Sequence, residues 1–273
     1  MIRFLIAVIK SRNNPSAIQP DVEALGIEPL SARSLILSVL LGTHPPVLSG
    51  RKLIGLAELF DIRAGTTRTA LSRMTASGEL VALDGDYELG PRLRQRQRQQ
   101  DDGRTTAPSR WDGRWYTAIT TAERRTVAER RAFRSAMVGA RMAELRPDIW
   151  MRPANIAAPV RPEDVALLHG ELDTDDPVDL VLQLWDLTDV DERSTELSEA
   201  IDRHRPSLDG GDSSVLPNTF VLSAAVVRFL RVEPQLPAEL VPLSWSAPQL
   251  RDHYDDFESA FQQLLRTFLL SLS

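Results

Sequence analysis

The stretch from residue 31 to residue 89 constrains the fold most, because three helical segments are followed at once by a hairpin. Ser31 and Ser49 are good N-caps for the first two helices, and Gly78 is a good C-terminal stop for the third. An Asp-Gly turn between two short apolar runs is a strong hairpin signal. The elements are expected at residues 32–41, 49–60, 67–77, 79–83 and 87–89. This order predicts a winged helix-turn-helix.

The third helix has the two faces that a helix in the DNA major groove needs. Ala70, Leu71 and Met74 form an apolar stripe that would hold the helix on its domain. Arginine can bind guanine edges through two hydrogen bonds, and Ser or Thr can reach phosphates or bases. The residues predicted to contact DNA from this helix are Thr66, Thr67, Arg68, Thr69, Ser72 and Arg73. An amphipathic surface helix would look the same, so the argument depends on its place before the hairpin.

Other basic residues flank this helix along the chain. Arg51 and Lys52 open the second helix and are also predicted to contact DNA. Arg92 and Arg94 begin a basic run through residue 98, which could either grip the DNA backbone or form a solvated linker helix. The hairpin turn at 84–86 is Asp-Gly-Asp and would repel phosphate, so its tip is not expected to enter a groove.

Residues 110–273 predict further domains. Strands are expected at 115–120, 148–152 and 178–187, and helices at 122–145, 162–170, 194–205, 218–231 and 248–272. Strands that alternate with helices over 115–187 indicate an α/β or α+β domain, and the remainder reads as helical.

The net charge of −6 is unevenly distributed. Residues 51–98 carry +3 and residues 110–153 carry +5, whereas residues 154–273 carry −14. The field at a surface depends on the local charge, so an acidic chain can still bind nucleic acid.

Composition argues against several classes of protein. The chain of 273 residues has no cysteine, which excludes disulfides and thiol catalysis and fits a cytoplasmic protein. Its four histidines show no metal-ligand spacing, and no Gly-rich phosphate loop or nucleophile elbow is present. No stretch approaches the ~20 apolar residues of a membrane span. We therefore expect no metal, no cofactor, no catalytic residues and no membrane partner.

Three segments, in order, resemble the PaaX-like repressors, the phenylacetate-degradation regulator family. The first is TRTALSRM at 67–74 with Gly78 and YEL at 87–89; the second is WDGRW at 111–115 with IWMRP at 149–153; the third is LPAELVP at 236–242 with Trp245. They cover about residues 31–260. No single motif is very specific, but the ordered set is.

The resemblance implies an α+β chain with an N-terminal winged helix-turn-helix, a central ferredoxin-like α/β domain and a C-terminal helical domain. The predicted boundaries are an arm at 1–30, the DNA-binding domain at 31–98, a linker at 99–109, the central domain at 110–190 and the helical domain at 191–273. The resemblance also implies a homodimer that releases its double-stranded DNA operator when it binds a small effector. In the best-known members this effector is an aryl- or acyl-CoA thioester. The acidic hairpin turn and the pair Glu233-Pro234, where members often have Asp-Pro, put the operator and the effector in doubt more than the fold.

An acyl-CoA would need cationic side chains beside aromatic surface. The residues proposed for it are Arg114, Trp115, Arg124, Arg131 and Arg152. The alternative is that the tryptophans belong to the core and the arginines to a solvated helix face.

Two other functions stay open. The winged helix could be a docking surface of a protein-interaction module that does not bind DNA. A nuclease-like enzyme is the other alternative, since ferredoxin-like nucleases of CRISPR adaptation carry an Asp at the end of their first strand. Here that strand ends near Ile119-Thr120-Thr121, and Asp112 precedes it.

Overall fold

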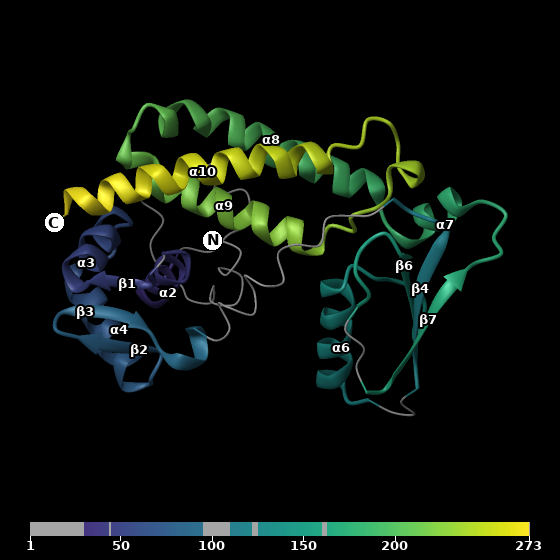
Figure 1. Ribbon diagram of the computed structural model, residues 1–273, viewed down its shortest axis with the longest axis horizontal. Helices are drawn as coiled ribbons and strands as arrows, with labels where there is room; N and C mark the ends of the chain where they lie inside the picture. Colours follow the sequence, from purple (N-terminus) through teal and green to yellow (C-terminus); the bar gives the residue numbers. More distant parts are fainter. Residues whose placement is uncertain (1–29, 44, 95–109, 122–124, 160–162, 273) are drawn as a thin grey trace. The chain divides into compact units, whose positions relative to one another are not determined.

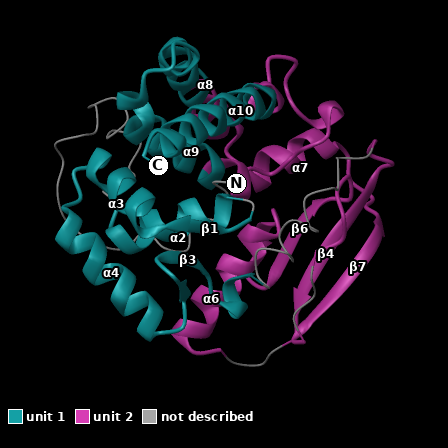
Figure 2. Ribbon diagram, turned by 60° about the vertical axis from the view of Figure 1, so that its left-hand side comes forward, with its two compact units in different colours: residues 1–104, 196–228, 250–273 teal, residues 105–195, 229–249 magenta. Residues whose placement is uncertain are grey.

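A computed structural model of the chain describes residues 30–43, 45–94, 110–121, 125–159 and 163–272. The chain forms two compact units, distinguished by colour in Figure 2. Unit 1 comprises residues 1–104, 196–228 and 250–273, and unit 2 comprises residues 105–195 and 229–249. The sequence predicts one helical domain at 191–273, whereas the structure divides those residues between the two units. The arm as far as residue 29 and the linker at 99–109 lie outside the described residues.

Unit 1 begins with three helices and a small antiparallel sheet (Figure 1). The elements are α2 (Ala32–Gly42), β1 (Val47–Ser49), α3 (Gly50–Leu59), α4 (Ala64–Ala76), β2 (Leu80–Leu83) and β3 (Asp86–Leu89). The strand order is β1-β3-β2, with β3 paired antiparallel to both neighbours. The predicted order of helices and hairpin is thus present, and β1 is an additional strand that the sequence did not predict.

Local signals explain the boundaries of these elements. The Ser31 hydroxyl accepts from the Ser34 amide at 3.1 Å, and the Ser49 hydroxyl accepts from the Lys52 amide at 3.3 Å, so both predicted N-caps are confirmed. Asp84 and Gly85 have φ of 47° and 91°, the left-handed conformation that a two-residue hairpin turn requires.

The start of α4 differs from the expectation. The helix begins at Ala64, not near Thr66, and its N-cap Arg63 makes no side-chain capping bond. Without a capping side chain, the sequence carries no local signal for this start.

Unit 2 contains a four-stranded antiparallel sheet. Its strands are β4 (Arg114–Thr120), β5 (Ala143–Arg146), β6 (Ile149–Pro153) and β7 (Val165–Glu171), in the order β5-β6-β4-β7. Helix α6 (Val127–Gly139) connects β4 to β5, and α7 (Pro177–Leu184) follows β7. The pairing of Thr117 with Met151 and of Ala118 with Trp150 sets which residues share a face.

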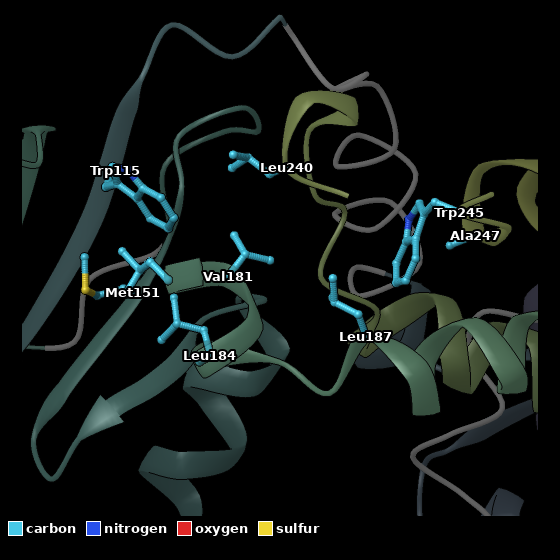
Figure 3. Close-up of a cluster of buried hydrophobic side chains, with 10 residues drawn as sticks. Trp115, Met151, Val181, Leu184, Leu187, Leu240, Trp245 and Ala247 are labelled. Carbon is cyan, nitrogen blue, oxygen red and sulfur yellow. The ribbon is translucent and has the colours of Figure 1, made fainter. Parts of the chain in front are cut away.

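Each face of this sheet has its own apolar cluster. Trp150, Ala118 and Val165 pack with Met137 at the end of α6. On the other face, Trp115 and Met151 pack with residues of α7, among them Val181 and Leu184 (Figure 3). The cluster includes Leu240, in the short 3-10 helix η3 (Ala238–Leu240), and Trp245. The sheet is therefore covered by one helix on each face.

Three predictions for unit 2 were wrong. Residues 165–171 form a strand, not a helix, because β7 pairs along its length with β4, from Arg114 opposite Glu171 to Thr120 opposite Val165. Residues 177–184 form a helix, not a strand: Asp176 caps it through the Val178 amide at 2.8 Å, and Pro177 occupies its first turn. The helix expected at 122–145 ends at Gly139, and β5 follows.

The last helices are α8 (Leu187–Asp209), α9 (Leu216–Val232) and α10 (Ala247–Ser271), with a short 3-10 helix, η2 (Ser213–Val215), before α9. Each of the three long helices contributes residues to both units. Within unit 1, the Phe220 ring of α9 lies 5.3 Å from the Phe60 ring and 6.1 Å from the Phe261 ring of α10, measured between centroids. These contacts join the C-terminal helices to the residue that ends α3.

Among the described residues, the stretch Ser213–Val232 is long and apolar enough to cross a membrane by length and composition. Its most apolar window is 72% buried inside the protein, as in the core helix of a water-soluble domain, so this stretch is weak evidence for a membrane span.

Candidate DNA-binding surface

The outer face of α4 brings together most of the predicted contacts. Thr66, Arg68, Thr69, Ser72 and Arg73 are all exposed. No ion pair engages either arginine within the described part of the chain, so both guanidinium groups are available to a ligand. The surface is therefore cationic, with small hydroxyl side chains between the two charges.

One predicted contact on α4 is wrong. Thr67 is fully buried, and its hydroxyl donates to the Arg63 carbonyl at 3.4 Å. Thr67, Leu71 and Met74 recur at helical spacing and form the inward stripe, so Thr67 belongs to the packing of the helix.

The residues predicted outside α4 differ in exposure. Arg51, at the start of α3, is exposed, and Lys52 is half-buried. Arg92 is exposed, whereas the Arg94 guanidinium lies 3.3 Å from the Glu88 carboxylate of β3, which offsets its charge. The rest of that basic run, including residues 96 and 98, lies outside the described residues. The turn between β2 and β3 exposes Asp84 and Asp86, so it is acidic as the sequence indicates.

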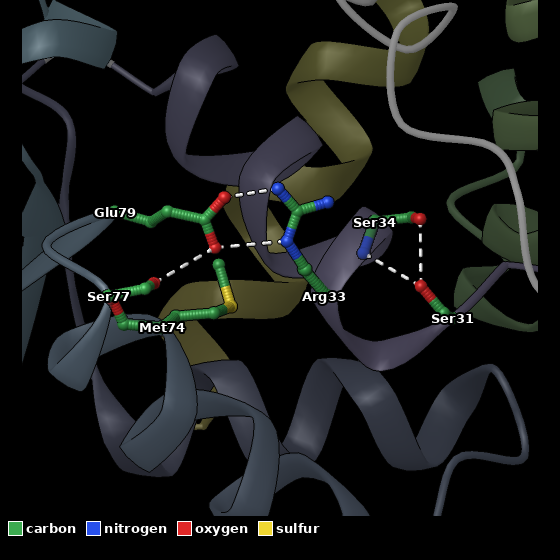
Figure 4. A network of polar contacts seen from close by, with 6 residues as sticks. All are labelled: Ser31, Arg33, Ser34, Met74, Ser77 and Glu79. Atoms are coloured by element: carbon green, nitrogen blue, oxygen red, sulfur yellow. Dashed lines mark hydrogen bonds and ion pairs between the residues drawn. The ribbon is translucent and has the colours of Figure 1, made fainter.

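A polar network ties the end of α4 to the start of α2 (Figure 4). The Arg33 guanidinium donates through Nε to the Glu79 carboxylate at 3.0 Å and makes a second contact to its other oxygen. The Ser77 hydroxyl donates to the Met74 carbonyl at 3.1 Å and lies 3.4 Å from the same carboxylate. This network was not predicted, because the two halves of the ion pair are 46 residues apart.

The network gives a pH-dependent prediction. The hydrogen bond from Arg33 lowers the pKa of the Glu79 carboxyl below its ordinary value. The pair therefore stabilises the fold above the pKa of the unfolded chain and loses that contribution as pH falls through the lower folded pKa. Because Arg33 is 48% exposed, we expect Glu79→Gln to cost at most about 1 kcal/mol at pH 7.

Urea unfolding of the protein and of Glu79→Gln between pH 7 and pH 3 measures this effect. The difference between the two should shrink as the carboxyl is protonated. Glu58→Gln, at an exposed site on α3, is the matched control and should change stability little at any pH. A Glu79→Gln difference that is unchanged down to pH 3 would contradict the assignment.

The described residues among those proposed for the effector differ in exposure. Arg114 and Arg131 are exposed, and Arg114 lies 3.7 Å from the Asp112 carboxylate. Trp115 is 2% exposed in the core against α7, so its proposed contact with a ligand is wrong and the core alternative holds for it. Arg152 is buried, and Arg124 lies outside the described residues.

No three His, Cys, Asp or Glu side chains converge on a possible metal position within the described ranges.

Comparison with known proteins gives the family. The chain matches the family described as PaaX-like protein over residues 31–93, which contain α2 to β3. It is also similar to the solved structure of an uncharacterised protein, Rv0674 from Mycobacterium tuberculosis. The two share 36% sequence identity and a TM-score of 0.71, and the match covers 87% of this chain and 98% of that one. The chain belongs to the PaaX-like family. No protein of curated function matches it.

Proposed function

We propose that this chain is a transcriptional regulator that binds double-stranded DNA, with α4 as its recognition helix. Membership of the PaaX-like family supports a regulatory role more than a catalytic one. In this proposal, α2 to β3 form a winged helix-turn-helix, and the hairpin β2–β3 is the wing. The observation that carries the proposal is the outer face of α4, where two arginines that form no ion pair with any described residue lie among exposed Thr and Ser side chains.

The two faces of α4 fit the proposed role of a recognition helix. Leu71 and Met74 are buried and hold the helix on its domain, while Arg68 and Arg73 are exposed to solvent. An arginine in the major groove can donate two hydrogen bonds to one guanine, which discriminates between bases. The acidic turn at Asp84 keeps the wing tip out of a groove in this proposal.

The rest of the proposal concerns unit 2 and assembly. The order β5-β6-β4-β7 and the antiparallel pairing are those of a ferredoxin-like sheet. The second helix comes after β7, on the opposite face from α6, so we propose a variant of that fold. Release of DNA by an acyl-CoA effector, a homodimer and a cytoplasmic location remain proposals that follow from the family resemblance.

The test of DNA binding is a titration of the purified protein into labelled duplex from upstream of its own gene, beside a scrambled duplex, at two salt concentrations. We expect tighter binding to the native duplex at both. Phosphate contacts weaken as salt rises for either duplex, so the preference between duplexes reports base reading. No binding to either duplex at low salt would favour the protein-interaction module.

Two further measurements address the effector and the assembly. Light scattering after gel filtration at micromolar concentration should show a dimer, since two copies related by a two-fold axis can contact two operator half-sites. Calorimetry with a panel of CoA thioesters should give heat for one of them. A monomer, or no heat with any thioester, would remove that part of the proposal.

A further inference from the structure

Arg152 on β6 is a buried cation whose donors are only partly used. The residue is 2% exposed, and its Nη2 donates to the carbonyl of Ala157, in the loop that follows β6. Neither Nε nor Nη1 has a hydrogen-bond partner among the described residues. A guanidinium carries N–H donors and no acceptor, so the N–H of Nε and both of Nη1 are unsatisfied.

A nearby carboxylate would offset the charge of Arg152. No carboxylate within the described ranges forms an ion pair with it. Burial, followed by the charge of Arg141, lowers the pKa of Arg152 to about 10, which leaves the side chain protonated at neutral pH. The Tyr116 ring lies 5.1 Å from the guanidinium carbon, a favourable contact that does not neutralise the charge. A buried and unpaired charge of this kind is costly, so an anion should bind beside it.

Arg141 supplies a second positive charge to the same region. It follows α6 in a left-handed conformation, with φ of 59°, and its Nη2 donates to the Leu230 carbonyl at 3.0 Å. Nearby in the chain, Asn155 donates to the Gln235 carbonyl at 2.7 Å, which holds the loop after β6 in place. The loop that accepts the Arg152 hydrogen bond is therefore held in place, and the positive charge of Arg141 contributes to lowering the pKa of Arg152.

We propose that Arg152 is a buried binding site for one oxyanion group of a small molecule, either a carboxylate or a phosphate. The planar guanidinium suits such groups because it donates parallel hydrogen bonds to two oxygens. A neutral thioester carbonyl would not offset the charge. Arg152 is also among the residues that the sequence predicts for the effector, but this site is tested apart from the proposed function, because anion binding is read from stability in the absence of DNA.

Thermal unfolding of the full chain in sodium chloride, compared with sodium phosphate, acetate or benzoate at equal ionic strength, tests the site. An anion that binds only the folded state raises Tm with concentration, by roughly 5–10 °C at one hundred times its Kd. A rise with phosphate alone assigns the site to phosphate groups, and a rise with acetate or benzoate alone assigns it to carboxylates. No concentration-dependent rise with any of the three would overturn the proposal.

Variants locate the binding. Arg152→Met removes the charge at similar length, and it should abolish the anion response while leaving Tm in chloride equal or higher. Arg152→Lys keeps a positive charge but cannot donate two parallel hydrogen bonds as a guanidinium does. It should therefore retain a weaker rise of Tm with the anion, which keeps the test valid if the methionine variant fails to fold. Arg114→Met, at an exposed arginine of β4, is the matched control and should keep the full response. An undiminished anion response in Arg152→Met would overturn the proposal, and if that variant does not fold, an undiminished response in Arg152→Lys would do so.

Discussion

Replacing Arg68 and Arg73 together with alanine should weaken binding to the native operator by about 30-fold or more. Each base-reading arginine is worth roughly 1–3 kcal/mol of discrimination, so even the lower figure for both gives about 2 kcal/mol. The preference for the operator over a scrambled duplex should fall with it. Both side chains are exposed and form no ion pair in the described structure, so the fold should tolerate the change.

Electrostatics alone could weaken binding in the same variant, because two positive charges are removed. The matched control is the double variant Arg130→Ala with Arg146→Ala, which removes two charges from exposed positions in unit 2. It should change affinity for both duplexes little and keep the preference. Equal losses in the two double variants, with the preference intact, would mean that α4 attracts DNA without reading its sequence.

Within α4, Thr69 and Thr67 show what a helical pattern can and cannot tell. Both are small polar residues in the same turn, and the sequence places both at the DNA. In the structure Thr69 is exposed, but Thr67 lies one turn before Leu71 on the packed face. A threonine hydroxyl can be buried when it donates to a carbonyl one turn back, as Thr67 does to Arg63. Residue type alone therefore could not separate the two.

The N-terminal elements could be predicted because their signals are local. The serine caps and the Asp-Gly turn act within four residues of chain, and each is present as expected. The helix predicted over residues 165–171 was wrong because the structure of this segment depends on pairing with β4, some fifty residues earlier. This pairing overrides helix-forming residues such as Ala166 and Leu167. The helix at 177–184 did carry a local signal, Asp176 followed by Pro177, that outweighs its apolar run.

The surroundings of Arg152 could not be predicted from the sequence for a different reason. Alternation along β6 places Arg152 on the face of Trp150, but only the fold brings the Ala157 carbonyl within hydrogen-bond distance of its guanidinium. The sequence therefore grouped Arg152 with Arg114 and Arg131, which are exposed. Its burial distinguishes Arg152 from those exposed arginines, and burial can be read only from the structure.

Phe220→Ala should be among the most destabilising single changes in unit 1. The side chain is 2% exposed and packs edge-on against Phe60, with an interplanar angle of 84°, and against Phe261. Truncating a buried phenylalanine costs about 3–5 kcal/mol, which is a large share of the ~5–15 kcal/mol stability of a typical domain. Tm should fall by on the order of 10 °C. Leu270→Ala, at a 69% exposed position of α10, is the control and should stay within about 0.5 kcal/mol of the parent.

The positions of the tryptophans allow the unfolding of unit 2 to be followed separately from that of unit 1. All five, at 111, 115, 150, 185 and 245, belong to unit 2, so their fluorescence reports on that unit, whereas far-ultraviolet circular dichroism reports on both. If the units unfold separately, Phe220→Ala should lower the transition seen by circular dichroism and leave the fluorescence transition in place. If the helices shared by both units couple them, the two transitions should fall together. A loss below about 1 kcal/mol by circular dichroism would mean that the Phe60–Phe220–Phe261 contacts do not hold α3 to the C-terminal helices, and the segment from α2 to β3 would then owe its stability to its own core.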